Sequence, residues 1–167
     1  MDYNFVGYGS LLDHESLNKT IKDKKFKPVI VKGYKRVFDL FDTKDKKDVL
    51  NIIKSKNSWF NGVSFKINEE ELKKLSIRED EYNIEEINVY DYKTKKKIGK
   101  ALISVDFFFD IDKKNRMPSK DYFTMCRKAA YSISKDFGKT WDETTFLADG
   151  TKVSRWLKKH GEYGNLN

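Results

Sequence analysis

The sequence is poor in cysteine and proline and has no long apolar run. It contains one cysteine, Cys126, and two prolines among 167 residues. A single cysteine excludes an internal disulfide, which is typical of a reducing compartment. The first residues, MDYNFVGYGSLL, lack the basic start and continuous apolar stretch of a signal peptide. No stretch of about 18 apolar residues occurs, so no helix could span a bilayer. We therefore expect a cytoplasmic protein that does not engage a membrane.

Arginine is also scarce. The net charge of +8 comes from 34 basic residues against 26 acidic ones. Of the basic residues 29 are lysines and 5 are arginines, and the lysines are spread along the chain among acidic residues. Base readout and bidentate phosphate recognition favour arginine. This distribution therefore disfavours a nucleic-acid-binding protein, although a basic nucleic-acid-binding domain is kept as an alternative.

Apolar residues are abundant enough for a folded core. They make up 38% of the chain and include 24 aromatic residues (12 Phe, 9 Tyr and 3 Trp). No Ser/Gly-rich linker, repeat or low-complexity tract interrupts the chain. We expect a single domain over residues 1–167.

Extended segments dominate the first two thirds of the sequence. Val63, Phe65 and Ile67 alternate with Ser64 and Lys66, the period of a half-buried strand. Strands are expected over 4–7, 29–31, 34–41, 49–53 and 60–67, and a hairpin is expected from 84–89 and 98–108 with its turn at 93–97.

Helices are expected at four places. Asn68 can cap a helix over 69–75, and Asp13 or His14 can begin a short helix through Leu17 and Ile21. The clearest helix is predicted over 119–137, from an N-cap at Ser119 to a terminator at Gly138, and a last one is predicted over 151–159. Consecutive strands with few intervening helices indicate the α+β class rather than βαβ repeats.

A loop with two glycines follows the first predicted strand. Gly7-Tyr8-Gly9-Ser10 lacks the Gly-Lys-Ser/Thr of a phosphate-binding loop and the third glycine of a dinucleotide fingerprint. Its backbone can turn sharply and direct amides at a carboxylate or a developing oxyanion. Taken alone, the local pattern favours an ordinary tight turn that ends a strand.

The segment Tyr8-Gly9-Ser10-Leu11-Leu12 resembles the hallmark loop of the γ-glutamylcyclotransferase-like superfamily, which includes ChaC-like and AIG2-like proteins. Further similar segments follow in the family's order. They are Val31-Lys32-Gly33-Tyr34-Lys35-Arg36-Val37-Phe38, Gly62-Val63-Ser64-Phe65-Lys66-Ile67, Leu75-Ser76-Ile77-Arg78-Glu79-Asp80-Glu81-Tyr82 and Pro118-Ser119-Lys120-Asp121-Tyr122. The resemblance covers most of residues 3–138 and implies a mixed, largely antiparallel, barrel-like β-sheet with a few flanking helices.

The resemblance implies an enzyme that cyclises a small γ-glutamyl amide or peptide to 5-oxoproline and releases an amine or amino acid. This reaction needs a general base and an oxyanion donor, but no metal, cofactor or nucleophilic residue. Glu79 is the expected base and works best if partly buried, because desolvation raises a carboxyl pKa. Glu81 is the alternative for this role. A non-catalytic member that binds a small metabolite at the same place is a second functional class.

The remaining expected site residues are substrate contacts. Tyr8, Gly9, Ser10, Leu11 and Leu12 would supply the loop's backbone donors. Tyr122 is expected to bond the substrate or to pack in the core, and Tyr82 to line the pocket or a half-buried strand face. Two segments depart from the family pattern: Ser76 or Ile77 stands where an aspartate is common, and Lys128-Ala129-Ala130 where many members carry Gly-Ala.

Four other side chains could carry chemistry. Arg36 is expected at the surface, with a pair to a rim carboxylate as the alternative. Cys126, on the apolar side of a predicted helix, is expected to be a buried structural thiol rather than a nucleophile. His14 and His160 have no zinc-ligand spacing. The amine released and the oligomeric state are left open by the sequence.

Overall fold

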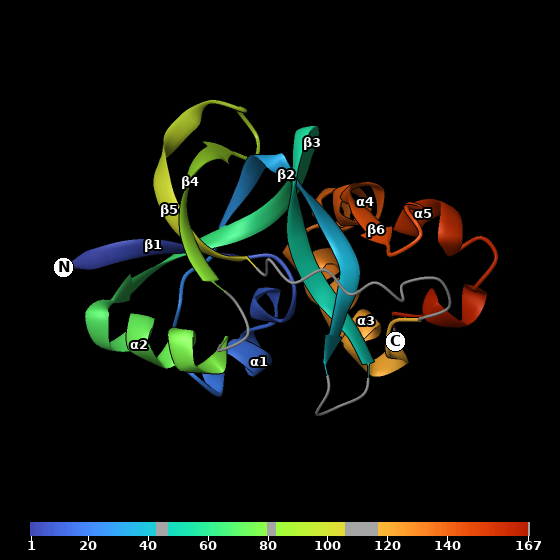
Figure 1. Ribbon diagram of the computed structural model, residues 1–167, viewed down its shortest axis with the longest axis horizontal. Coiled ribbons are helices and arrows are strands. Elements are labelled where there is room, and N and C mark those ends of the chain that lie inside the picture. Colours follow the sequence, from blue (N-terminus) through green and yellow to red (C-terminus); the bar gives the residue numbers. More distant parts are fainter. Residues whose placement is uncertain (43–46, 80–82, 106–116, 167) are drawn as a thin grey trace.

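The chain has an α+β fold built around one sheet (Figure 1). The computed structural model describes residues 1–42, 47–79, 83–105 and 117–166. Over these residues the sheet has six strands: β1 Asp2–Gly7, β2 Lys27–Asp42, β3 Lys47–Asn68, β4 Asn83–Asp91, β5 Lys97–Val105 and β6 Thr145–Leu147.

Five of these strands close into a ring. The sheet order is β3-β1-β5-β4-β2-β6, and an additional β2–β3 pairing joins the two ends of the five-strand part. Only the β1–β5 and β2–β6 pairings are parallel among the described strands. The expected mixed, largely antiparallel, barrel-like sheet is therefore confirmed.

Strands β2 and β3 are longer than predicted. The segments predicted separately at 29–31 and 34–41 form β2, and those at 49–53 and 60–67 form β3. Their register shifts from Lys32↔Trp59 to Tyr34↔Lys54, so the polar residues between 54 and 59 are an irregularity within one strand. Pairing along the whole length of two neighbouring strands outweighs the local polar composition, which alone indicated a break.

The predicted hairpin is confirmed as β4 and β5. They pair antiparallel, with Ile87 opposite Ala101, and residues 92–96 connect them. β5 ends at Val105 in the described part of the chain, and the predicted positions 106–108 lie outside it.

Short helices connect and flank the strands. Helical turn η1 spans Ser10–Leu12 and α1 spans His14–Asn18, where the Ser16 amide donates to Asp13 Oδ2 at 2.8 Å. Helix α2 runs over Glu69–Arg78. It begins with the predicted Asn68 cap, completed by Glu71 as a capping box. The C-terminal part contains α3 Lys120–Ile133, α4 Lys135–Thr144, α5 Val153–Trp156 and η2 Gly161–Tyr163.

Two helix predictions were wrong in their boundaries. The helix predicted over 119–137 ends at Ile133, because Ser134 adopts an extended backbone and caps a new helix, α4. Gly138 therefore lies inside α4 and terminates nothing. The helix predicted over 151–159 is confined to Val153–Trp156, with turns after it.

Gly138 is needed for the close packing of α4 on α3. A Cβ built on it would lie 2.3 Å from a ring carbon of Tyr131. We expect Gly138→Ala to destabilise the protein by about 1–3 kcal/mol, because the ring or the helix must shift to admit the methyl group. Denaturant unfolding measures this. Gly161→Ala is the matched control, since its Cβ would meet nothing within 4 Å, and equal stabilities of the two variants would contradict the prediction.

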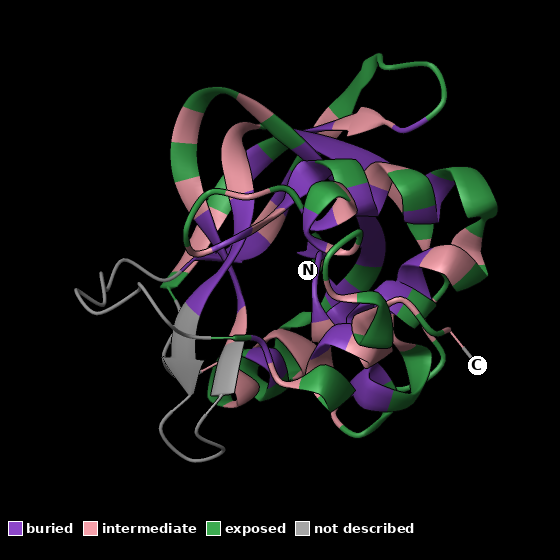
Figure 2. Cartoon of the chain, turned by 90° about the vertical axis from the view of Figure 1, so that its right-hand side faces the viewer, coloured by how far each residue is buried: buried purple, intermediate pink, exposed green. Residues whose placement is uncertain are grey.

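The core fills the ring and continues beneath α3 and α4. Buried positions gather along the inner surfaces of strands and helices (Figure 2). Phe123 of α3 packs on Phe38, Trp141 and Trp156, with ring centroids 5.5–5.9 Å apart. This aromatic cluster fixes the helical layer against β2. In the described part of the chain, no helix has the length and hydropathy needed to cross a membrane.

Candidate active site

The glycine loop connects β1 to η1, as the sequence predicts. Strand β1 ends at Gly7, and the helical turn begins at Ser10. The Leu12 amide donates to the Gly9 carbonyl at 3.0 Å. The amides at the start of a helical turn precede its first internal bond. The Ser10 and Leu11 amides therefore stand where they can donate to a bound group.

Gly9 allows the loop to approach Tyr122 closely. A Cβ on Gly9 would lie 3.1 Å from Tyr122 Oη and 3.3 Å from Leu50 Cβ. The Tyr122 hydroxyl, presented by the first turn of α3, accepts from the Leu50 amide at 3.3 Å. Burial raises the pKa of Tyr122 well above its ordinary value, and the nearby charge of Glu79 contributes to this shift. The phenol therefore stays neutral and keeps its proton as a donor.

Glu79 lies directly after α2. Its amide closes the last turn by donating to the Leu75 carbonyl at 2.9 Å, and its side chain is 13% exposed. This is the partly buried position expected for a carboxylate base. Helix α2, whose start is set by the capping box, thus delivers this carboxylate at its end.

Arg78 ties the end of α2 to the glycine loop and to α1. Its guanidinium donates to Ser10 Oγ at 3.3 Å, and to the carbonyl and hydroxyl oxygens of Ser16 at 2.7 Å each. A third partner is Thr20 Oγ1 at 3.0 Å. A planar fork with several bonds fixes orientation better than a single contact does. Arg78 therefore anchors the end of α2, directly before Glu79, against the glycine loop.

One small cavity brings the loop and Glu79 together. Its volume is about 30 Å³, and it is lined by Val6, Tyr8, Gly9, Ser10, Leu11, Leu50, Glu79, Ser104 and Tyr122. Six residues expected at the site are among them: Glu79, Tyr122 and the four loop residues from Tyr8 to Leu11. Leu12 is not part of this lining and packs in the core at 2% exposure. Tyr82 lies outside the described residues.

Tyr8 lines the cavity while its hydroxyl is engaged elsewhere. The hydroxyl donates to the Ser104 carbonyl at 2.8 Å, and the ring packs edge-on against Phe60. Tyr8 therefore shapes the wall and joins the loop to β5.

Arg36 is buried, so the expectation of a surface arginine was wrong. The side chain is 0% exposed and donates to oxygens of Tyr8, Asn61, Thr144 and Thr145. It lies between the rings of Phe60 and Trp141, 5.3 Å from each centroid. Burial lowers the pKa of Arg36 to about 9, which leaves the guanidinium charged at neutral pH. The Arg36 guanidinium also donates to the Tyr8 carbonyl at 3.3 Å and so helps to fix the position of the glycine loop.

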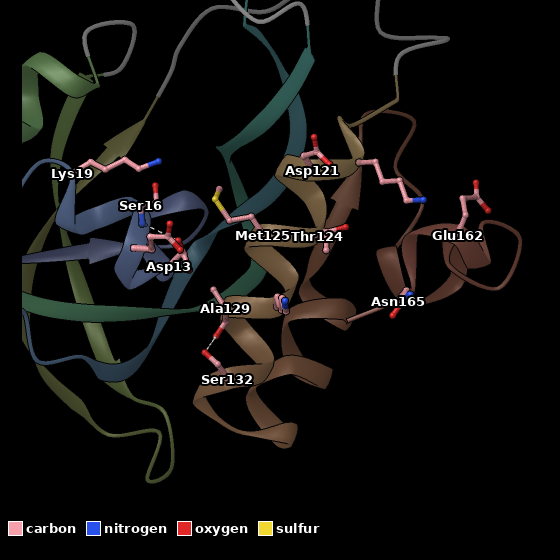
Figure 3. Close-up of a pocket in the computed structure, with 13 residues that line it drawn as sticks. Asp13, Ser16, Lys19, Asp121, Thr124, Met125, Ala129, Ser132, Glu162 and Asn165 are labelled. Atoms are coloured by element: carbon pink, nitrogen blue, oxygen red, sulfur yellow. Dashed lines mark hydrogen bonds between the residues drawn. The ribbon is translucent and has the colours of Figure 1, made fainter. Parts of the chain in front are cut away.

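A much larger hollow lies between α1 and α3 (Figure 3). Its volume is about 740 Å³, and acidic and basic side chains line it from both helices and from the segment near Glu162. None of the residues expected at the site belongs to it. Its size therefore does not mark it as the place for the predicted chemistry.

Cys126, His14 and His160 pack against other side chains and lie outside the cavity lining. Cys126 is buried at 0% exposure, as predicted. His14 stacks on Phe26 and His160 on Trp156, with centroids 3.9 and 4.4 Å apart. Over the residues that the structure describes, no three His, Cys, Asp or Glu side chains gather where they could hold a metal ion.

Sequence reasoning missed several residues of the cavity and its support. Leu50 and Ser104 line the cavity from β3 and β5, and neither belongs to a recognisable motif. Strand alternation sets Ser104 opposite the buried Ala101, Ile103 and Val105, which is the pattern of an outward polar residue. Arg78 lies in the segment that the sequence singles out for Glu79, Glu81 and Tyr82, and no role of its own was predicted for it. No local signal would have revealed these roles.

Comparisons with known proteins agree with this fold. The family model for ChaC-like proteins matches residues 4–156. A search of the curated proteins gives no match. Similar solved structures include an uncharacterized protein from Homo sapiens, at 17% identity and a TM-score of 0.72 over 96% of this chain and 98% of that chain.

Two further solved structures carry activity names. A gamma-glutamyl cyclotransferase is 16% identical, with a TM-score of 0.71 over 97% of this chain and 99% of that chain. A gamma-glutamyl cyclotransferase specific to glutathione, from yeast, is 13% identical, with a TM-score of 0.56 over 97% and 96%. At these identities the neighbours establish the fold alone. The family match spans most of the sequence, and the chain belongs to the ChaC-like protein family.

Proposed function

We propose that this protein is a γ-glutamylcyclotransferase-like enzyme, which cyclises a γ-glutamyl amide or peptide to 5-oxoproline and releases the amine or amino acid. The observation that carries the proposal is the shared cavity. Glu79 and the loop residues Tyr8, Gly9, Ser10 and Leu11 line one cavity, although about 70 residues separate them in sequence.

The reaction is an internal acyl transfer. The substrate's α-amino nitrogen attacks its own γ-carbonyl carbon, so a C–N bond forms and a tetrahedral oxyanion develops. Glu79 takes a proton from the attacking nitrogen and gives it to the leaving nitrogen as the original amide bond breaks. The carboxylate is regenerated, and no external reactant is consumed. Because nucleophile and carbonyl belong to one molecule, holding the substrate folded supplies much of the rate.

The loop and Tyr122 are the proposed oxyanion and substrate contacts. The Ser10 and Leu11 amides are fixed dipoles that need no reorganisation when charge develops on the carbonyl oxygen. Tyr122, whose raised pKa keeps it protonated, is a neutral donor beside them. Leu12 is proposed to act through packing that supports the turn, and Tyr82 remains a proposed pocket residue.

The size of the cavity restricts what it can hold. About 30 Å³ is well below the several hundred Å³ of a pocket that encloses a whole small ligand. We infer that it receives the reacting amino group, while the rest of the substrate lies across the loop outside it. The amine or amino acid to be released would then be selected by residues beyond the cavity.

A substrate panel tests the proposal. The purified protein would be incubated with γ-glutamyl dipeptides, γ-glutamyl-lysine and glutathione, and 5-oxoproline would be quantified. The similar structures include one named for specificity to glutathione, which makes this compound a necessary member of the panel. We expect 5-oxoproline from at least one substrate. Binding of 5-oxoproline without turnover of any substrate would instead support a non-catalytic protein that binds a metabolite.

A further inference from the structure

Ser104 carries a buried hydroxyl that the protein itself does not satisfy. The residue is 3% exposed, and among the described residues Ser104 Oγ has no hydrogen-bond partner. Its carbonyl is occupied, because it accepts from the Tyr8 hydroxyl at 2.8 Å. The unsatisfied polar atom of this residue is therefore the side-chain oxygen alone.

The position of this hydroxyl is as informative as its lack of a partner. Ser104 lines the same cavity of about 30 Å³ as Glu79 and Tyr122. A buried hydroxyl without a partner costs stability, and alanine at this position would avoid that cost. Because the cavity is this small, a polar atom that enters it lies close to the groups that line it. The missing partner of Ser104 therefore belongs to what the cavity binds.

We propose that Ser104 is a substrate contact, whose hydroxyl oxygen accepts a hydrogen bond from the α-amino group of the γ-glutamyl substrate. This inference depends on the proposed function for the placement of that group. A neutral amine has two N–H bonds and one lone pair. With one N–H directed to Glu79 and the other to Ser104, the lone pair is left to face the γ-carbonyl carbon.

The two contacts have different fates during the reaction. The proton on the Glu79 side moves to the carboxylate and then to the leaving nitrogen. The hydrogen on the Ser104 side stays on the nitrogen and becomes the ring N–H of 5-oxoproline. Ser104 gains and loses no proton, and it contacts the same N–H in substrate and product.

This difference allows a binding test that needs no turnover. The lactone 5-oxotetrahydrofuran-2-carboxylate has the shape of 5-oxoproline, with a ring oxygen in place of the N–H. Calorimetry would give the affinities of both compounds for wild type, Ser104→Ala and Ser64→Ala. Ser64 is the matched control, a buried serine on β3 that is not part of the cavity lining.

We expect wild type and Ser64→Ala to prefer the lactam over the lactone by about tenfold, the effect of one hydrogen bond. Ser104→Ala is expected to lose this preference while its melting temperature is unchanged or raised, because an unsatisfied buried hydroxyl has been removed. A purely structural serine would give the opposite stability result. Ser104→Cys, with a weakly accepting sulfur, should show the same loss and replaces the alanine variant if that variant does not fold.

The outcomes separate this inference from the proposed function. A Ser104→Ala protein that keeps the lactam preference overturns the inference even if wild type produces 5-oxoproline. If wild type shows no turnover but prefers the lactam, and Ser104→Ala loses that preference, the inference is supported and the catalytic proposal is overturned. A wild type that binds neither compound overturns the role of Ser104.

Discussion

Replacing Glu79 with glutamine is expected to reduce the rate of 5-oxoproline formation by about 10²- to 10⁴-fold, the range that a positioned general base contributes. Glutamine keeps the size of the side chain but cannot take the proton from the attacking nitrogen. Its neighbours in the cavity, including Tyr122 and the loop, are left unchanged. We therefore expect the loss in kcat, with a smaller change in KM, when product is quantified under single-turnover and steady-state conditions.

Two glutamates provide controls for this result. Glu69, exposed on the first turn of α2, is matched in chemistry but lies at the opposite end of the helix from the cavity. Glu69→Gln should retain wild-type kinetics. Glu81, which lies outside the described residues, is the alternative base. An active Glu79→Gln protein together with an inactive Glu81→Gln protein would transfer the catalytic role to Glu81.

Arg36→Met is expected to lower the free energy of unfolding by about 2–4 kcal/mol, because several bonds from one charged donor are lost and buried oxygens lose partners. Two of these bonds, to Thr145 Oγ1 and Asn61 Oδ1, measure 2.8 Å each. The desolvation of the cation, seen in its lowered pKa of about 9, offsets part of the loss. Urea unfolding measures the net effect.

The same substitution should also affect the site. Without Arg36, the Tyr8 carbonyl loses its donor at 3.3 Å, and the glycine loop is held less firmly in position. We expect a lower kcat in the fraction that remains folded. Arg155→Met, at an exposed position, is the control and should stay within about 0.5 kcal/mol of wild type. If Arg36→Met has the same urea midpoint of unfolding as wild type, the buried network does not stabilise this fold.

Local sequence signals predicted much of the secondary structure. The Asn68 cap, the alternation around Phe65 and the β4–β5 hairpin depend on neighbouring residues, and all three are present. The break at Ser134 depends on packing between helices. There the Tyr131 ring occupies the space beside Gly138, and a glycine that resembled a terminator serves close contact instead.

The site required both the family resemblance and the fold. The resemblance selected Glu79 and the loop, but only ring closure of the sheet and the contacts of Arg78 bring them to one cavity. Arg36 and Ser104 could not be assigned from sequence, because burial of a polar side chain on a strand depends on elements far along the chain. For Arg36 these elements are β3, which carries Asn61, and the junction of α4 and β6 at Thr144 and Thr145.

A crystal structure of the protein with bound 5-oxoproline tests the central claim most directly. We predict the ring nitrogen in the cavity beside Glu79 and Ser104, with the ring carbonyl oxygen directed to the Ser10 and Leu11 amides. Binding in the hollow between α1 and α3, with the cavity beneath the loop left closed, would contradict this account of the active site.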